Sequence, residues 1–316
     1  MSPLSIHVLK HAQVADAEEV FCEIARSRGH TARVVDPCAT VFKLTPDAAP
    51  DVVVGRSELD SFSDPALCAY MAYFDACAAA GSAVVNSLEF LLVCQDKFRT
   101  HTAVRRHLRS LGVEDTINPD TALCFHSRQA TEVAARFLQR HGSVILKKPH
   151  SGRGDGVFGA ASPHAVESIL RSEFPSGEPV LLQQPIDKET NERGGFKDFR
   201  VLAYRDAPTG QVEIAAAYYR NGEPGELKTN GSRGGGISSA GPTDPELLRW
   251  TRHVMDALRG DVAGLDFARD KQGRYWFLEV NFAFETLRRS SLTMFGNTIW
   301  EKAVDLAEAR AAARPR

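Results

Sequence analysis

The stretch GLDFARDKQGRYWFLEVNFAFE, residues 264–285, decides the fold of the C-terminal part of this 316-residue chain. Its pattern predicts a β-hairpin with one strand over 262–268, a polar turn over 269–273 and a second strand over 274–281. The second strand is rich in aromatic and branched apolar residues, which are typical of a buried strand. An acidic residue in a buried strand is costly unless another group pairs with it.

Three oxygen-bearing side chains of this hairpin are expected to share one face. Glu279 and Asn281 lie two residues apart on the second strand, so both point to the same side. Asp266 lies on the antiparallel strand beside them and can reach that side. Two carboxylates and an amide oxygen are the oxygen-only ligands that Mg²⁺ prefers, and replacing either carboxylate by its amide is expected to leave the fold intact. The alternative is a surface hairpin with solvated acids.

The composition predicts an ordinary soluble protein of two or three compact units, with 43% hydrophobic and 25% charged residues. The formal net charge of -2 gives no electrostatic case for binding nucleic acid or an anionic membrane. Six scattered cysteines without a C-x-x-C pair indicate reduced thiols in the cytoplasm. The apolar stretch in the first residues is too short for a signal peptide, and Asp75 interrupts the longest small-apolar run, so no membrane span is expected.

Strands and helices alternate through the first part of the chain, which predicts a parallel sheet with crossover helices. Arg56 and Asn86 follow two of these predicted strands, at the edge where open α/β sheets place ligand groups. The alternative is that both residues cap loops. The predicted strands are SIHVLK, TARVVDP, DVVVGR and SAVVNS.

A glycine-rich loop after a predicted strand indicates a phosphate site. Glycines at 152, 154 and 156 allow backbone amides to approach phosphate oxygens, although a flexible turn is an equally good interpretation of glycines alone. Lys147 ends the strand that enters the loop, and Lys148 points to the opposite face, so only Lys147 is expected to reach a phosphate. Further polar groups follow on later strands and loops: Arg200, Asn230 and Arg233.

The order of these motifs is similar to that of the ATP-grasp superfamily and, within it, the RimK-like branch of ligases related to glutathione synthetase. The resemblance covers nearly the whole chain, and six loose motifs in the right order make it strong. The motifs are an entry segment VVNS...CQDKFRTHTAVRRHLRSLGV...PDT, a nucleotide strand and loop VILKKPHSGRGDGV, an adenine hinge LLQQPI, a strand KDFRV, a loop LKTNGSRGG and the hairpin quoted above.

The resemblance assigns expected roles to residues of this chain. Arg200 and Arg233 are expected near the transferring phosphoryl group, and Asp266, Glu279 and Asn281 are expected to hold Mg²⁺, or Mn²⁺ in its place. The residues expected to contact the nucleotide are Lys97, Lys147, Gly152, Gly154, Gln183, Gln184, Asp198 and Asn230.

The resemblance also implies an α/β fold of three parts. These are an N-terminal parallel-sheet domain over 1–93, a central lid subdomain over 94–182 and a C-terminal subdomain with the metal site over 183–316, with the two β-rich subdomains clasping ATP. The implied function is an ATP-dependent carboxylate–amine ligase that forms an amide through an acyl phosphate and releases ADP and phosphate. Its substrates would be a small-molecule or peptide carboxylate and an amine. Assembly into a homo-oligomer is a further possibility that the resemblance leaves open.

Two departures from the family pattern leave the substrate open. After E-V-N this chain continues FAFETLRRSS, where relatives usually have small residues and a Pro-Gly turn, and this region borders the acceptor site. The loop SGRGDG also differs from the frequent G-S-x-G-x-G. Arg288 and Arg289 keep a kinase that phosphorylates a hydroxyl as the first alternative. A non-catalytic nucleotide-binding module is the second, and the intact set of three metal ligands disfavours it.

Overall fold

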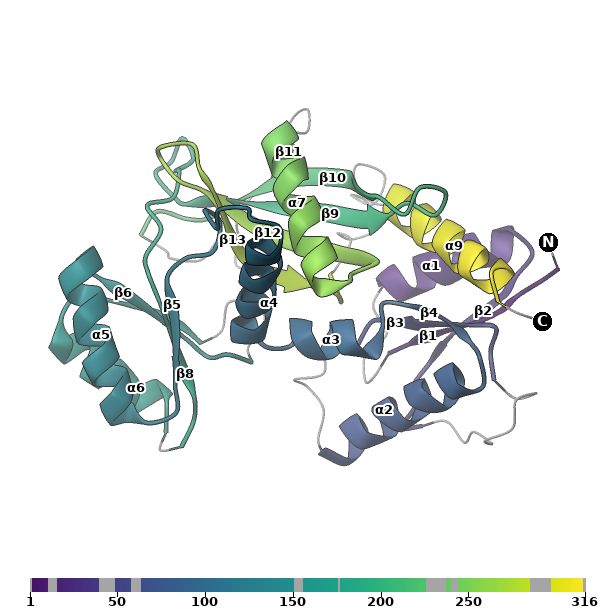
Figure 1. Ribbon diagram of the computed structural model, residues 1–316, viewed down its shortest axis with the longest axis horizontal. Helices are drawn as coiled ribbons and strands as arrows, with labels where there is room; N and C mark the ends of the chain where they lie inside the picture. Colours follow the sequence, from purple (N-terminus) through teal and green to yellow (C-terminus); the bar gives the residue numbers. More distant parts are fainter. Residues whose placement is uncertain are drawn as a thin grey trace.

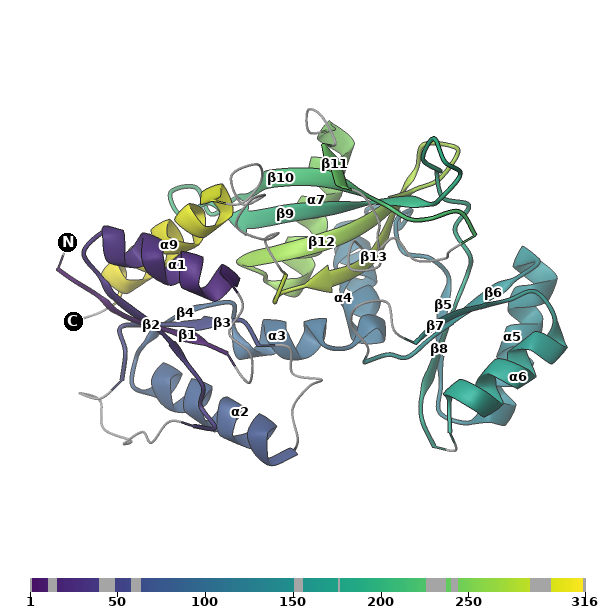
Figure 2. The ribbon, with the colours of Figure 1, turned by 180° about the vertical axis from the view of Figure 1, so that it is seen from behind.

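Three β-sheets follow one another along the chain in the computed structural model of the protein, and the largest sheet lies between the other two (Figures 1 and 2). The description covers residues 2–10, 16–39, 49–57, 64–150, 156–175, 177–225, 237–239, 244–284 and 297–314. No helix among these residues is both long and apolar enough to cross a membrane.

The N-terminal sheet is parallel, with strand order β2-β1-β3-β4, as the alternating pattern predicts. Its central strands β1 and β3 are buried on both faces, because helices α1 and α9 cover one side and α2 covers the other (Figure 1). The elements are β1 (Ser5–Leu9), α1 (Asp16–Ser27), β2 (Thr31–Val35), β3 (Val52–Gly55), α2 (Asp64–Ala79), β4 (Ala83–Val85) and the C-terminal helix α9 (Asn297–Ala312).

Arg56, directly after β3, forms its hydrogen bonds with protein groups. Its guanidinium is 2% exposed and donates to Glu18 Oε1 at 2.9 Å. It also donates to the carbonyl oxygens of Phe282 and Phe284, at 3.3 and 2.8 Å. The rings of Phe284 and Trp300 lie 5.0 and 4.6 Å from its charged carbon. Arg56 therefore ties the N-terminal sheet to the chain that follows the hairpin.

Asn86, directly after β4, joins the first sheet to the third. Its backbone has a φ of +59°, in the left-handed region that asparagine tolerates better than most residues. Its side-chain NH₂ donates to the carbonyl oxygen of Val262, and its Oδ1 accepts from the N–H groups of Asp261 and Val262. For Asn86, as for Arg56, the structure favours the capping interpretation over the ligand interpretation.

The second sheet has strand order β5-β8-β6-β7 with antiparallel pairing throughout. Two helices, α5 and α6, pack together on one face of this sheet (Figures 1 and 2). The bounds are β5 (Thr121–Cys124), α5 (Ser127–His141), β6 (Val144–Lys147), β7 (Val157–Ala160), α6 (Pro163–Glu173) and β8 (Val180–Gln183).

The third sheet has strand order β11-β10-β9-β12-β13, and it contains the predicted hairpin as β12 and β13. Helices α4 and α7 pack against each other and cover the apolar face of this sheet. The bounds are α3 (Leu88–Cys94), α4 (Lys97–Ser110), β9 (Lys197–Arg205), β10 (Val212–Asn221), β11 (Ile237–Ser239), α7 (Pro245–Leu258), β12 (Val262–Arg269) and β13 (Tyr275–Asn281).

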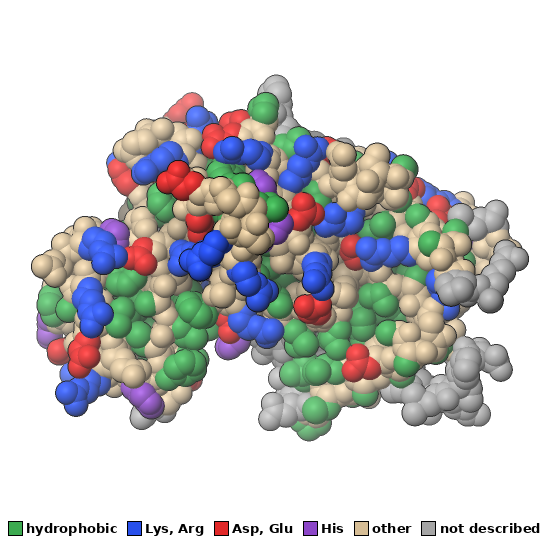
Figure 3. All heavy atoms as spheres, in the orientation of Figure 1, with side chains coloured by type: hydrophobic (Ala, Val, Ile, Leu, Met, Phe, Trp, Pro, Cys, Tyr) green, Lys and Arg blue, Asp and Glu red, His purple; other side chains and the backbone are tan. Residues whose placement is uncertain are grey.

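Helix α4 is amphipathic, as its sequence predicts. Val104 and Leu108 are fully buried in the core beneath it, whereas Arg99, Arg106 and Arg109 are exposed. In Figure 3 basic side chains gather over this region with acidic side chains among them. The basic face of α4 is thus a solvated surface.

The three sheets follow the order of the three predicted parts of the chain. Strand β8 ends one residue past the predicted boundary at 182, α4 packs against α7, and α9 packs against α1. Helices therefore cross between the predicted parts, and the division into 1–93, 94–182 and 183–316 stays a proposal.

Candidate nucleotide and metal site

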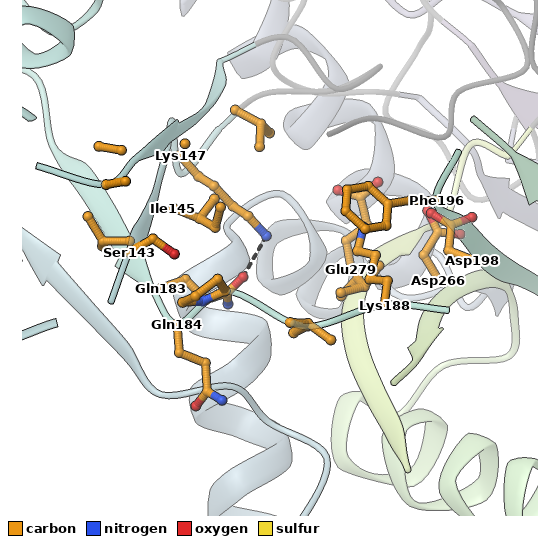
Figure 4. A pocket seen from close by; sticks show the side chains of 18 of the residues that line it. Ser143, Ile145, Lys147, Gln183, Gln184, Lys188, Phe196, Asp198, Asp266 and Glu279 are labelled. Carbon is orange, nitrogen blue, oxygen red and sulfur yellow. Dashed lines mark hydrogen bonds between the residues drawn. The ribbon is translucent and has the colours of Figure 1, made fainter. Parts of the chain in front are cut away.

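A cavity of about 460 Å³ lies between the second and third sheets (Figure 4). Its apolar lining comes from both sheets and from the segment between them, through residues such as Ile145, Val157, Ile186, Phe196 and Leu278. Most of its charged groups come from the face of the third sheet that is turned away from α7. The polar lining residues are Lys147, Gln183, Gln184, Lys188, Asp198, Arg220, Asp266 and Glu279.

Strand register brings the predicted carboxylates together. Asp266 on β12 faces Glu279 on β13, and on its other side it faces Arg200 on β9. Glu279, Asp266 and Arg200 thus form a row across three strands. Next to this row, Asp198 on β9 faces Arg220 on β10. Directly opposed residues of antiparallel strands have their side chains on the same face, so all five charged groups point to one side of the sheet.

Two arginines neutralise the two aspartates in this row. Arg200 holds both oxygens of Asp266, with Nη2 at 3.0 Å from Oδ2. Arg220 holds both oxygens of Asp198 at 2.7 and 2.9 Å, and its Nη2 also lies 2.8 Å from Asp266 Oδ2. Burial opposes the charge of Arg220, but Asp266 and Asp198 outweigh it and raise the arginine pKa well above its usual value.

Glu279 is the more accessible carboxylate, with 31% of its side chain exposed. Lys97, at the first turn of α4, places Nζ 4.0 Å from Glu279 Oε2. Burial raises the pKa of Glu279, but the nearby cations Lys97, Arg220, Arg200 and Lys147 outweigh burial and hold it below its usual value. Glu279 is therefore ionised at neutral pH, as a metal ligand has to be.

The three predicted metal ligands meet as expected, and their donor atoms suit Mg²⁺. Asn281 Nδ2 donates to Asp266 Oδ2 at 3.3 Å, and Glu279 lies opposite Asp266, so the three side chains are neighbours on one face. Two carboxylates and an amide are oxygen donors throughout. Asp266 is 1% exposed and shares both oxygens with arginines, so a bound cation would replace part of those contacts.

Lys147 reaches the cavity and Lys148 does not line it, as the strand pattern predicts. Lys147 Nζ donates to Gln183 Oε1 at 2.6 Å (Figure 4). Lys148 Nζ instead lies 3.7 Å from Glu178 and 5.9 Å from the ring of Phe174, on the helix side of the second sheet.

The two hinge glutamines line the cavity, but their side chains bind protein groups. Gln184 Oε1 accepts from the backbone N–H of Asp120 at 2.8 Å. The side chain of Gln183 contacts Lys147, Thr121 and His101. The expected contacts of Gln183 and Gln184 with the nucleotide stay a prediction.

Two cations of the cavity were not predicted from the sequence. Arg220 lies on the strand beside the predicted Asp198, at a register position that only the pairing of β9 and β10 reveals. Lys188 follows β8 in an irregular segment, and burial lowers its pKa although Asp198 opposes this effect. Because Lys188 lies outside a regular strand or helix, no periodic pattern in the sequence could predict which way its side chain points.

Four predicted site residues lie outside the described residues: Gly152, Gly154, Asn230 and Arg233. Among the described residues, five cations (Lys97, Lys147, Lys188, Arg200 and Arg220) surround three carboxylates (Asp198, Asp266 and Glu279). Two positive charges are therefore in excess when all eight groups are ionised. This surplus favours a polyanion with its counter-cation as the occupant.

Solved structures share this architecture. The ATP-grasp ligase PsnB, in a structure complexed with minimal precursor, Mg and ADP, matches with a TM-score of 0.67 and 17% identity, over 98% of this chain and 99% of that one. The D-cycloserine synthetase DcsG matches with a TM-score of 0.69 and 15% identity, over 96% and 99% of the two chains. The fold is therefore the ATP-grasp fold, which confirms the predicted fold class.

A family model described as the RimK-like ATP-grasp domain matches residues 94–298, which is more than half of the chain. A probable alpha-L-glutamate ligase of Mannheimia succiniciproducens is 27% identical over 268 residues, which cover 85% of this chain and 80% of that protein. The chain belongs to the RimK-like ATP-grasp family. The predicted family and the predicted class of enzyme, an ATP-dependent carboxylate–amine ligase, are confirmed.

Proposed function

We propose that the protein transfers the γ-phosphoryl group of ATP to a substrate carboxylate and then joins the resulting acyl phosphate to an amine. The observation that carries this proposal is the cavity between the second and third sheets, which brings Lys147 and Lys188 opposite the arginines and carboxylates on one face of the third sheet. The adenine ring would lie beside the second sheet, near Ile145 and Gln183, and the phosphates would point to the charged face of the third sheet.

In this proposal the cations of the cavity stabilise charge on the transferring group. Lys147 and Lys188 would bind phosphate oxygens, while Arg200 and Arg220 would turn from their aspartates toward the group in flight. Asp266, Glu279 and Asn281 would hold Mg²⁺, with Mn²⁺ as a substitute of similar ligand preference. The metal would supply positive charge beside the phosphates. Gly152, Gly154, Asn230 and Arg233 keep their predicted roles.

The two chemical steps balance without a nucleophilic side chain of the protein. A carboxylate oxygen attacks the γ-phosphorus and ADP leaves; the amine then attacks the acyl carbon, loses a proton and displaces phosphate. Phosphoryl transfer depends on positioning and charge stabilisation. The charged side chains on the third sheet, together with the lysines of the cavity, would provide both for the first step.

The name of the curated relative makes L-glutamate the first amino acid to test as substrate. Peptide carboxylates come second, because another structure of PsnB is complexed with a precursor peptide. Arg288 and Arg289, which keep the kinase alternative open, lie outside the described residues, so no described contact favours that alternative. A homo-oligomer and a cytoplasmic location stay predictions.

Hydroxylamine trapping tests the proposed reaction before the natural amine is known. With ATP, Mg²⁺ and a panel of amino acids and short peptides, hydroxylamine is expected to take the place of the amine and give a hydroxamate from the correct carboxylate. ADP and phosphate should form in equal amounts. A stable phosphorylated hydroxyl without hydroxamate would support the kinase, and AMP with pyrophosphate would contradict the phosphoryl-transfer step.

The affinity for ATP is expected to fall as the pH rises above 7. Burial lowers the pKa of Lys147 to about 7, Lys188 and Lys97 act in the same direction, and Glu279 opposes them. A phosphate beside Nζ favours the ammonium form, so the pKa of Lys147 is higher in the complex than in the free protein. The lysine's contribution to affinity is therefore complete below pH 7 and is lost as the pH rises through the higher pKa of the complex.

Calorimetric titration with ATP between pH 7 and 9 measures this dependence. Lys147→Arg provides the control, because arginine stays charged over the whole range. The variant is expected to bind ATP with an affinity that changes less with pH than that of the wild type, because of the two lysines only Lys188 still titrates. The same pH dependence in both proteins would show that Lys147 does not contact the phosphates.

A further inference from the structure

We infer that His101 is a positioning residue that orients the side-chain amide of Gln183, and that this amide in turn holds Lys147 in the nucleotide cavity. His101 lies on α4, is 4% exposed and is not among the described residues that line the cavity. The inference rests on the proposed function in one respect, the role of Lys147 as a phosphate contact.

The hydrogen bonds that connect Asp115, Asn118, His101, Gln183 and Lys147 are called the relay below. Its first link determines which ring nitrogen of His101 carries the proton. Asp115 Oδ1 accepts from the backbone N–H and the side-chain NH₂ of Asn118, at 3.1 and 2.9 Å. The Asn118 amide oxygen therefore points away from Asp115 and lies 2.8 Å from His101 Nδ1. An amide oxygen only accepts hydrogen bonds, so Nδ1 carries the proton.

The second link fixes the orientation of Gln183. Burial lowers the pKa of His101 to about 4, so the ring is neutral at neutral pH and a protonated Nδ1 leaves Nε2 as an acceptor. The Gln183 NH₂ group lies 3.3 Å from this nitrogen and 3.1 Å from Thr121 Oγ1. The Thr121 hydroxyl donates to the carbonyl oxygen of Pro119, so it also accepts from the amide. Both neighbours of this NH₂ group thus require a donor.

The third link reaches the lysine. With its nitrogen held by His101 and Thr121, Gln183 turns Oε1 toward Lys147, and Nζ donates to it at 2.6 Å. An ammonium group only donates, so a flipped amide would place two donors against each other. Each hydrogen bond of the relay pairs a donor with an acceptor in this one arrangement.

The ring of His101 is itself held in place. It packs edge-on against the ring of Phe277 on β13, with centroids 5.3 Å apart. Phe277 lies two residues before Glu279, so the strand that carries the metal ligand also supports the relay. A purely packing role for His101 is the competing explanation, and the two explanations differ in what a leucine and a glutamine would do at this position.

His101→Leu and His101→Gln form the matched pair for the test. Leucine fills the space but accepts no hydrogen bond, whereas glutamine can offer its amide oxygen to the NH₂ group of Gln183. In the leucine variant Thr121 alone of the two neighbours still accepts from the NH₂ group of Gln183, so the amide is held less firmly. Oε1 then faces Lys147 in a smaller fraction of molecules, and the ammonium form becomes less favourable. The glutamine variant is expected to behave like the wild type.

The first readout needs no nucleotide. NMR titration of ¹³C-labelled lysine, with the Lys147 signal assigned by Lys147→Arg, is expected to show a lower pKa for Lys147 in His101→Leu than in the wild type and in His101→Gln. An unchanged titration in the leucine variant, or equal changes in both variants, would overturn the inference. Thr121→Val removes the other acceptor and is expected to lower this pKa less, which keeps the test decisive if His101→Leu does not fold.

The second readout links the relay to the ligand. His101→Leu is expected to bind ATP about tenfold more weakly than the wild type and adenosine equally well, because the lost contact concerns the phosphates. Weaker binding of both ligands would assign Gln183 to the base and overturn the inference. If the wild type binds neither ligand, the proposed function fails while the lysine titration still decides the inference.

Discussion

Replacing Glu279 by glutamine is expected to reduce turnover by about a thousandfold while the protein stays folded. The substitution removes one of two carboxylates from the proposed metal site, and a contribution of several kcal/mol to charge stabilisation in the transition state depends on that metal. The glutamine has the same shape, and 31% of the side chain is exposed, so the free energy of unfolding should change little. Steady-state kinetics at saturating Mg²⁺ and urea unfolding measure the two effects.

The control for this prediction is Glu213→Gln. Glu213 also lies on the third sheet, but it pairs with Arg252 in an exposed ion pair away from the cavity. We expect this variant to keep full activity. Full activity of Glu279→Gln at saturating Mg²⁺ would remove Glu279 from the metal site.

Asp266 needs a different expectation from the one drawn from the sequence. The sequence predicted that an amide at position 266 or 279 leaves the fold intact. The Asp266 carboxylate, however, is 1% exposed and forms ion pairs with both Arg200 and Arg220. Removing its charge leaves those guanidinium groups with less compensation in a buried setting. Asp266→Asn therefore confounds activity with stability, and Glu279→Gln is the cleaner variant.

Arg220→Gln is expected to have the largest effect on stability, a loss of about 3–5 kcal/mol. The guanidinium bridges Asp198 and Asp266, whose side chains are 3% and 1% exposed. Its removal leaves two buried carboxylates with one fewer cation between them. Urea unfolding at pH 7 measures the loss, and Asp198→Asn in the same background is expected to recover part of it, because one of the two carboxylates then becomes neutral.

Arg205→Gln is the matched control on the neighbouring strand. Arg205 pairs with Asp256, whose side chain is 47% exposed, and exposed ion pairs contribute about 0–1 kcal/mol. If Arg220→Gln and Arg205→Gln cost the same free energy, Arg220 is not the structural bridge described here.

The hairpin and its charged face could be predicted because their cause is local. Alternation along two short strands fixes which side chains share a face, and the position of Lys147 against Lys148 follows from the same period of two. The parallel N-terminal sheet followed from alternating elements for a comparable reason. In the hairpin and at Lys147, the spacing in the sequence is enough to determine which way each side chain points. In the N-terminal sheet, the order of elements is enough to determine that the strands are parallel.

The partners of these side chains could not be predicted, because they depend on register between strands distant in sequence. Arg220 meets Asp198 only once β9 and β10 have paired. Arg56 followed a strand end, as ligand-binding groups do, but the chain after the hairpin folds back over it and supplies carbonyl oxygens from Phe282 and Phe284. Gln183 belongs to a motif that the sequence shows, but the orientation of its amide depends on the buried His101, which is distant in sequence.

The most direct test of the ligase assignment follows the oxygen atoms of the substrate carboxylate. The carboxylate that hydroxylamine trapping identifies is labelled with ¹⁸O at both oxygens and is turned over with unlabelled ATP and the amine. Attack of a carboxylate oxygen on the γ-phosphorus forms a P–O bond that stays with the phosphate when the amine displaces it. Mass spectrometry is therefore expected to find one ¹⁸O atom in each inorganic phosphate released. Phosphate without ¹⁸O would contradict the transfer of phosphoryl to a carboxylate, and with it the central claim.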